Sequence, residues 1–238
     1  MNASPPFKLD ESDPISRWRR ETFYTKEPHT VEWIRGFHSG ALFLDVGANI
    51  GIYSLYSAAL GHTVVSLEPE SQNFAALYRN IFANNFQDRI TAYPLALTSE
   101  NQPILNNLFL SEFITGGSCH NAGESKNWRG DPMNTRFRQG CITLSYRMLK
   151  AFSCVEPEYI KIDVDGNEPD VIAGLELRKR TALKSLCVEV NMNRDDHKRM
   201  IYSIVDCGFR FDGEQVAKAL RPAGHPFFGC AEIIFTRA

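Results

Sequence analysis

The sequence predicts an α/β protein in which helices cover both faces of a mostly parallel sheet. Two observations carry this prediction. Short apolar runs alternate with amphipathic stretches along most of the chain, and the first run leads through a glycine turn into helix-forming residues. Strands that alternate with helices form parallel sheets, because each crossover returns the chain to the same edge. With 238 residues, the chain has room for one large domain or two small ones.

The strands are predicted first, because strands buried in a parallel sheet are short and almost continuously apolar. The run that ends at Val46 is followed by Gly47, and the next one ends at Glu68-Pro69. By this criterion, strands are expected at residues 41–46, 63–67, 89–97, 158–164, 183–190, 209–211 and 232–235.

The helices are predicted from apolar residues that recur on one helical face. Phe74, Leu77 and Ile81 share such a face, Gly61 is positioned to end the preceding helix, and Asn167 suits the N-cap of a later one. Helices are expected at residues 29–37, 50–60, 70–84, 167–177 and 194–207.

Two segments depart from this alternation. Residues 1–14 are polar and rich in proline, so we expect a poorly ordered arm. Residues 99–140 are rich in Gly and Asn and too long for an ordinary connector, although 105–110 and 114–119 could form short strands. We therefore expect an arm and lead-in helix at 1–40, followed by one domain at 41–238 that contains this insert. A Gly/Pro-rich loop is expected to join the last two strands.

Composition excludes several classes of protein. The formal charge of −2, from 26 basic and 28 acidic residues, argues against a nucleic-acid partner held by a broad basic face. No stretch has the roughly 20 apolar residues of an integral membrane segment, and the first residues lack the apolar core of a secretory signal. The six cysteines form no CxxC pair, so we expect reduced thiols, no zinc site and a cytoplasmic protein.

The strongest chemical signal is the segment 44–54, in which a strand, a glycine turn and a helix follow one another. Glu68 stands 21 residues after Gly47, at the end of the next strand, where an acid can bind ribose hydroxyls. A dinucleotide would place its pyrophosphate on GxGxxG, but Asn49 replaces the second glycine, and Asp45 is unfavourable beside a phosphate. S-adenosylmethionine has an ammonium group, a carboxylate and a ribose but no phosphate, so Asp45 and Glu68 favour it over NAD. A tight turn without any ligand is the remaining interpretation.

A second signal lies in residues 159–168. Lys161, Asp163 and Asp165 fall on the same parity of a strand, and charges in a central strand are costly unless they are paired. Asp163 would emerge at the carboxyl edge of the sheet, where it could orient or deprotonate a hydroxyl that accepts a methyl group. Lys161 is equally well explained as a catalytic residue or as the structural partner of Asp163.

Three further residues are candidates with strong alternatives. Glu189 and Asn191, at the end of the next strand, could ligate Mg²⁺ together with Asp163 or Asp165. Acids at strand ends are common, however, so we assign no metal site. His120, in the insert, could act as a base, but a solvent-exposed loop histidine explains it as well.

Together these segments resemble the FkbM family of methyltransferases. The resemblance rests on residues 44–54, 68–70 and 160–168, with a lead-in at 25–34, and it runs from about residue 25 to residue 190. The order and spacing of the segments make it more specific than any one motif.

The resemblance implies a class I, Rossmann-like methyltransferase: a three-layer sandwich around a seven-stranded sheet whose last strand is antiparallel. It implies S-adenosylmethionine as the donor and O-methylation of a hydroxyl on a small molecule, a sugar, a glycan or another natural product. The family's cofactor motifs fall on Asp45, Gly47, Asn49, Gly51 and Glu68, and its later acidic motif falls on Asp163, Asp165 and Glu168. The insert departs from a minimal core and is expected to shape the acceptor pocket.

Three hypotheses follow: an O-methyltransferase, an NAD-dependent oxidoreductase, and a module that binds S-adenosylmethionine without catalysis. For the first, the acceptor oxygen attacks the methyl group in line, and positioning supplies most of the rate. Asp163 is expected both to bind the donor and to serve as catalytic base; His120 and Lys161 complete the candidate catalytic set. The sequence does not indicate an oligomeric state.

Overall fold

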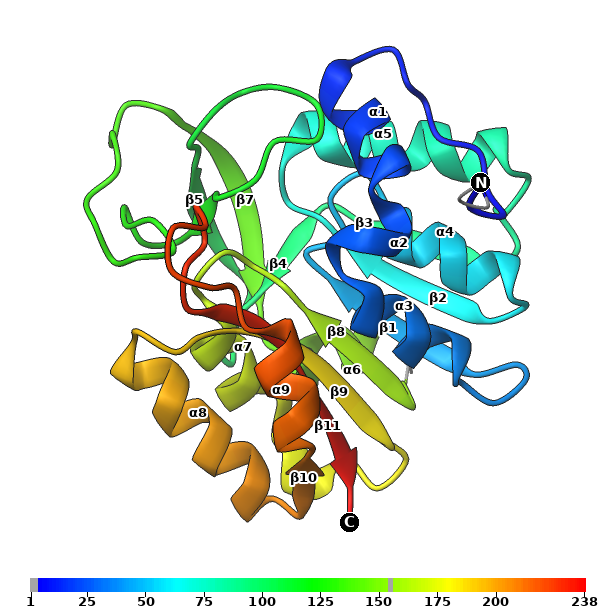
Figure 1. Ribbon diagram of the computed structural model, residues 1–238. Coiled ribbons are helices and arrows are strands. Elements are labelled where there is room, and N and C mark those ends of the chain that lie inside the picture. The colour runs from blue at the N-terminus through cyan, green and yellow to red at the C-terminus, as the bar shows by residue number, and fades with distance from the viewer. Residues whose placement is uncertain (1–3, 154–155) are drawn as a thin grey trace.

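The computed structural model describes residues 4–153 and 156–238 and has three layers around a seven-stranded sheet (Figure 1). In the order β10-β11-β9-β8-β1-β2-β3, only β11 runs antiparallel to its neighbours. This confirms the predicted fold class. The strands are β1 (Leu42–Val46), β2 (Thr63–Leu67), β3 (Ile90–Tyr93), β8 (Tyr159–Ile162), β9 (Ser185–Asn191), β10 (Phe209–Phe211) and β11 (Cys230–Arg237).

Two apolar cores lie on opposite faces of this sheet, because successive strand side chains point to opposite sides. Phe43 and Val64 face one core, whereas Leu44 and Val65 face the other. The first core is covered by α3 (Pro28–Arg35), α4 (Ile52–Ala59) and α5 (Ser71–Ala83), and the second by α6 (Tyr146–Ser153), α7 (Glu168–Leu175) and α8 (Asp195–Asp206).

The insert forms a second sheet of four strands in the order β4-β7-β5-β6. The strand predicted at 89–97 is two strands, because the chain leaves the main sheet at Pro94, which has no N–H to donate. The strand expected at 105–110 is present, whereas 114–119 forms no strand. The four strands are β4 (Leu95–Leu97), β5 (Ile104–Phe109), β6 (Asn121–Ala122) and β7 (Arg138–Leu144).

The prediction of a poorly ordered N-terminal arm is wrong for its described part. The side chains of Phe7 and Leu9 are buried in the core beside α4 and α5. The N–H of Lys8 donates to Asn84 Oδ1 at 2.7 Å, and the N–H of Asp10 donates to Asn80 Oδ1 at 2.8 Å. The arm therefore follows α5 before the chain enters α1 (Pro14–Glu21) and α2 (Phe23–Lys26) (Figure 1).

The connection between the last two strands is also more ordered than predicted. It contains α9 (Gly213–Ala219), which packs along β11, before the Gly/Pro-rich loop. Five of the cysteines are free, and the sixth, Cys154, lies outside the described residues.

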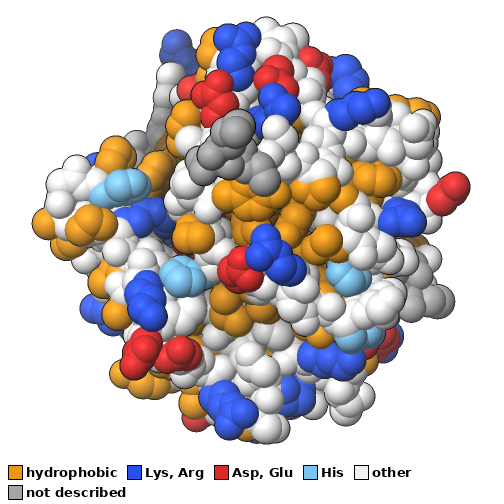
Figure 2. Space-filling model, turned by 45° about the vertical axis from the view of Figure 1, so that its right-hand side comes forward, with side chains coloured by type: hydrophobic (Ala, Val, Ile, Leu, Met, Phe, Trp, Pro, Cys, Tyr) orange, Lys and Arg blue, Asp and Glu red, His pale blue; other side chains and the backbone are white. Residues whose placement is uncertain are grey.

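The exterior is mixed in charge. On the face drawn in Figure 2, Lys and Arg side chains are scattered among acidic, apolar and neutral ones rather than gathered into one basic area. Within the described parts of the chain, no helix has the length and apolar character needed to cross a membrane.

Candidate active site

A cavity of about 790 Å³ lies at the carboxyl edge of the main sheet, within the size range of small-molecule sites. The sheet contributes Gly47, Glu68, Asp163 and Glu189, each at or just beyond the end of a strand. Segments far apart in sequence form its other walls: residues 15–29, 112–122 and 218–227 all contribute side chains. Such an edge is where open α/β sheets bind ligands.

The glycine turn after β1 is held in a backbone conformation that few side chains tolerate. Gly47, Asn49 and Gly51 have φ values of 81°, 53° and 91°. A Cβ atom on Gly47 would lie 1.9 Å from the carbonyl oxygen of Asp163, and one on Gly51 would lie 2.4 Å from Leu77 Cδ1. Gly47 is therefore required for the approach of two strand ends, and Gly51 for the packing of α4 against α5.

Asn49 explains why the second glycine of a dinucleotide motif is absent. Its side-chain Nδ2 donates to the carbonyl oxygen of Gly117 in the insert at 2.7 Å. Asn73 donates to the same carbonyl and accepts from the N–H of Gly116. The asparagine thus joins the turn to the insert, which a glycine could not do.

Glu68 lies just beyond the end of β2, and its role in ribose binding stays a prediction. It lines the cavity, and its carboxylate oxygens accept from the N–H groups of Asn49 and Glu70, both at 2.8 Å. Each oxygen retains a further lone pair for a ligand hydroxyl. Burial raises the pKa of Glu68 to about 8, although the two N–H groups act in the opposite direction.

Asp45 lies deeper than Glu68 and is not among the residues that line the cavity. Its side chain is 1% exposed, and Oδ2 accepts from the hydroxyl of Ser54 at 2.6 Å. Oδ1 is buried without a hydrogen-bond partner among the described residues. Burial raises the pKa of Asp45, and the nearby Lys161 opposes this shift. Gly51 is likewise absent from the cavity wall.

Lys161 and Asp163 form an ion pair of 2.8 Å at the end of β8. Lys161 is almost fully buried, with Nζ 5.0 Å from the centre of the Tyr53 ring, whereas Asp163 lines the cavity. Burial acts to lower the pKa of Lys161, but Asp163, Asp45 and Glu27 outweigh it and hold the pKa above its usual value. Lys161 is therefore protonated and can fix the orientation of Asp163, but it is not positioned to be a base.

Asp165 and Glu168 stabilise the turn between β8 and α7. Asp165, at φ 57°, accepts from the N–H of Cys119 in the insert at 2.8 Å. Glu168 is fully buried and accepts from the N–H groups of Val164 and Gly166. Burial raises the pKa of both acids to about 7, and Asp163 adds to this shift.

His120 is buried, at 8% exposure, so it is not the solvent-exposed loop residue of the alternative interpretation. It lines the cavity, and Nδ1 accepts from the N–H of Ser111 at 3.3 Å. Burial lowers its pKa, so the ring is neutral at pH 7. A neutral ring that accepts at Nδ1 carries its proton on Nε2, which has no hydrogen-bond partner in the described chain. In this tautomer the Nε2–H of His120 can donate to a group in the cavity, whereas neither ring nitrogen is free to accept a proton.

Arg221 is a site residue that the sequence reasoning missed. Its guanidinium lies within salt-bridge distance of Glu27 (3.6 Å), Glu189 (3.2 Å) and Glu232 (2.5 Å). Glu27 also accepts from the Tyr53 hydroxyl at 2.5 Å. These residues come from the lead-in, two strands and the last loop, so no local spacing pattern links them.

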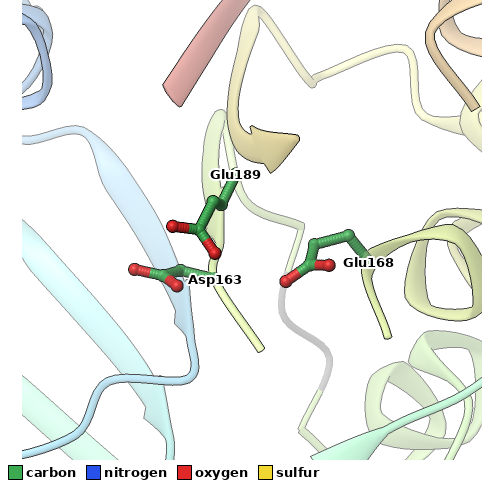
Figure 3. A group of neighbouring side chains, drawn as sticks. All are labelled: Asp163, Glu168 and Glu189. Atoms are coloured by element: carbon green, nitrogen blue, oxygen red, sulfur yellow. The ribbon is translucent and has the colours of Figure 1, made fainter. Parts of the chain in front are cut away.

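Three acids converge next to this network. One oxygen from each of Asp163, Glu168 and Glu189 lies within 4.8 Å of the others. Figure 3 shows the three side chains close together, with the carboxylate of Glu168 directed toward the other two. Asp165 and Asn191, considered with them from the sequence, are held elsewhere: Asp165 by Cys119, and the Asn191 side-chain amide by the carbonyl of Trp128 at 3.4 Å.

Comparison with solved structures defines the class of the protein. Precorrin-6y C5,15-methyltransferase from Geobacter metallireducens GS-15 is 12% identical, with a TM-score of 0.51, and the match covers 98% of this chain and 95% of that one. The human methyltransferase 10 domain containing protein is 11% identical, with a TM-score of 0.51 and coverage of 98% and 89%. A ribosomal protein L11 methylase from Lactobacillus delbrueckii subsp. bulgaricus is 12% identical, with a TM-score of 0.50 and coverage of 92% and 79%. At such identities the likeness shows the fold, which is that of the class I, Rossmann-like methyltransferases.

The sequence then gives the family. The model of the methyltransferase FkbM domain matches residues 45–211, and the chain belongs to the FkbM methyltransferase family. It is therefore an S-adenosylmethionine-dependent methyltransferase, as the resemblance implied, and not an NAD-dependent oxidoreductase. A search of the curated proteins found no match to this sequence.

Proposed function

We propose that this protein transfers the methyl group of S-adenosylmethionine to a hydroxyl of a small-molecule or glycan acceptor. The observation that carries the proposal is the placement of Glu68 and Asp163 in the walls of one cavity, at the ends of different strands. A donor bound through its ribose at Glu68 would have its reactive end within the same cavity as Asp163.

The residues present fit the donor. Glu68 offers two oxygens that are already oriented by backbone N–H groups, which is the arrangement a ribose diol requires. Asp45 fits less directly, since it lies behind the cavity wall and its Oδ2 accepts from the hydroxyl of Ser54. Four of the proposed cofactor residues line the cavity and are therefore proposed to contact the donor: Gly47, Asn49, Glu68 and Asp163. The other two, Asp45 and Gly51, are proposed to support the turn.

When bound, the donor supplies a methyl group on a positively charged sulfur, which is already a good leaving group. The chain then has to hold the acceptor oxygen in line with that methyl group and accept the hydroxyl proton. Asp163 is suited to both tasks, because it lines the cavity and Lys161 fixes the orientation of its carboxylate through Oδ2. His120 would donate from Nε2 to an oxygen of the acceptor.

The composition of the far wall favours a hydroxylated acceptor over a polyanion. Glu27, Glu189 and Glu232 line it together with Arg221, and Trp18 and Phe227 add aromatic surface. The carboxyl groups can accept hydrogen bonds from hydroxyls, whereas Arg221 is already paired with these acids rather than free for phosphates, which disfavours a nucleic-acid acceptor.

The test uses donor labelled with ¹³C in its methyl group, cell extract as the source of acceptor, and identification of the labelled product by NMR. We expect an O-methyl product, and we expect Asp163→Asn to lower its rate of formation by about 100-fold. Asp170→Asn is the matched control, because Asp170 accepts a hydrogen bond from the Ser99 hydroxyl and does not line the cavity. An N-methyl or C-methyl product would contradict the proposed acceptor, and equal rates for the two variants would remove Asp163 from the mechanism.

A further inference from the structure

We propose that Asp163, Glu168 and Glu189 bind one divalent cation that prefers oxygen ligands, at the floor of the acceptor side of the cavity. The binding of the cation stands on the geometry of the three acids. Its role, to bind the acceptor hydroxyl and make it more acidic, rests on the proposed function.

The three carboxylates come from separate elements that meet at one point. Asp163 follows β8, Glu168 begins α7, and Glu189 lies near the end of β9, with one oxygen of each within 4.8 Å of the others (Figure 3). Two backbone N–H groups already fix Glu168, so little ordering is needed on binding. Asp163 and Glu189 also line the cavity, which leaves access for a cation and room for an acceptor oxygen. An all-oxygen set of this kind suits Mg²⁺ or Mn²⁺.

A buried histidine independently points to this site. His197 is 2% exposed, its Nδ1 accepts from the N–H of Asn191 at 3.1 Å, and its Nε2 has no hydrogen-bond partner among the described residues. Nε2 lies 3.6 Å from Oε2 of Glu168 and, in this tautomer, directs its N–H toward that carboxylate. At 3.6 Å the two groups form no hydrogen bond, so among the described residues a buried donor beside the three acids has no partner, and an oxygen ligand of a bound cation would supply one.

Around the three acids, buried carboxyl groups outnumber buried Lys and Arg side chains. Lys161 is paired with Asp163 and lies near Asp45, and Arg221 is shared among Glu27, Glu189 and Glu232. Glu168 accepts from backbone N–H groups and lies beside the ring of His197, and among the described residues no Lys or Arg is paired with it. Buried acids in excess of buried bases are costly unless a cation joins them. A divalent ion among the three carboxylates would supply the missing positive charge.

The test is a titration of the purified chain with Mn²⁺ in the absence of methyl donor. Binding is measured as the loss of the electron paramagnetic resonance signal of free Mn²⁺. We expect one tightly bound Mn²⁺ per chain, displaced by excess Mg²⁺. We expect Glu189→Gln and Glu168→Gln each to weaken binding at least about tenfold, as the loss of a ligating or orienting group does in metal sites. Glu189→Gln is the safer variant, because the amide leaves the turn after β8 intact.

Glu68→Gln is the matched control, since it removes a buried acid that lines the same cavity but is not one of the three proposed ligands. It should retain Mn²⁺ binding while it loses affinity for S-adenosylhomocysteine, and Glu189→Gln should show the reverse. No saturable Mn²⁺ binding by the wild type, or equal binding by Glu189→Gln, would overturn the metal site. The titration with S-adenosylhomocysteine contains no metal. A failure of the donor site would therefore be seen separately from a failure of the metal site.

Discussion

At the scale of single residues, burial and neighbours decide what each acid can do. Asp45 and Glu68 both stand at strand ends, yet only Glu68 lines the cavity, where two N–H groups hold its carboxylate. Asp45 is turned toward Ser54 and is 1% exposed. The sequence places both acids at the correct edge of the sheet, but it does not tell which side chain reaches the ligand.

The raised pKa of Glu68 predicts how donor affinity depends on pH. With a pKa of about 8, Glu68 is protonated in the free protein at pH 7, whereas ribose hydroxyls donate best to the ionised form. Affinity for S-adenosylhomocysteine should therefore rise from pH 6 to 8 and level off above, with proton uptake by the buffer on binding. Calorimetry in buffers of different ionisation enthalpy measures this.

Glu68→Gln should remove that pH dependence, so a variant with the wild-type slope would contradict the assignment. The same shift has a consequence for folding. Because the pKa is higher in the folded state, the stabilisation is complete at pH values below the usual value for Glu and is lost as the pH rises through about 8. The free energy of unfolding of the ligand-free protein should fall over that window, and less so in Glu68→Gln.

At the scale of elements, the strands and helices of the main sheet could be predicted, whereas most of the second sheet could not. The runs that form β1, β2, β8 and β9 are almost wholly buried, so their apolar pattern was sufficient. By contrast, β7 contains exposed and polar residues and was not predicted, because it pairs with β5, which is far from it in the sequence. The insert is tied to the site by Asn49 and Asp165 through backbone groups of Gly117 and Cys119, and no periodicity encodes such contacts.

The turn between β1 and α4 gives a prediction of stability. Gly47→Ala places a methyl group against the carbonyl of Asp163 and forces a residue with a side chain to φ 81°. We expect a loss of about 2–5 kcal/mol, from left-handed strain plus overpacking. Chemical denaturation measures the loss.

Gly40→Ala is the control for this prediction. Gly40 has a similar φ of 73°, but a Cβ there would meet no atom within 4 Å. It should therefore show only the strain of about 1–2 kcal/mol. Equal losses in the two variants would mean that the approach of the two strand ends is not tight.

At the scale of the whole molecule, the cavity is completed by both ends of the chain. Arg19 of the lead-in donates to the carbonyl of Gly116 in the insert at 2.7 Å, and Arg221 near the C-terminus pairs with Glu27. Open α/β sheets bind ligands at the carboxyl ends of their strands, and this expectation placed Gly47, Glu68 and Asp163 in the site from the sequence. It could not place Glu27 or Arg221, because their approach depends on the packing of the complete chain.

The docked N-terminal arm gives a second stability prediction. Phe7 is buried, and its ring meets that of Phe23 edge-on at 5.2 Å. Phe7→Ala should lower the free energy of unfolding by about 3 kcal/mol, as for other buried aromatic residues. Phe152→Ala, at a residue that is 73% exposed, should change it by less than about 0.5 kcal/mol. An unchanged midpoint in Phe7→Ala would mean that the arm is not docked in solution.

The central claim is that Glu68 binds the donor in the cavity at the sheet edge. The most direct test is calorimetric titration of S-adenosylhomocysteine into the wild type, Glu68→Gln and Glu70→Gln. Glu70 is an equally buried acid two residues away that caps α5 and does not line the cavity. Loss of a charged hydrogen bond of about 1.5–3 kcal/mol predicts an affinity about 10- to 150-fold lower for Glu68→Gln and nearly unchanged for Glu70→Gln. Wild-type affinity in Glu68→Gln, or no binding by the wild type, would contradict the account.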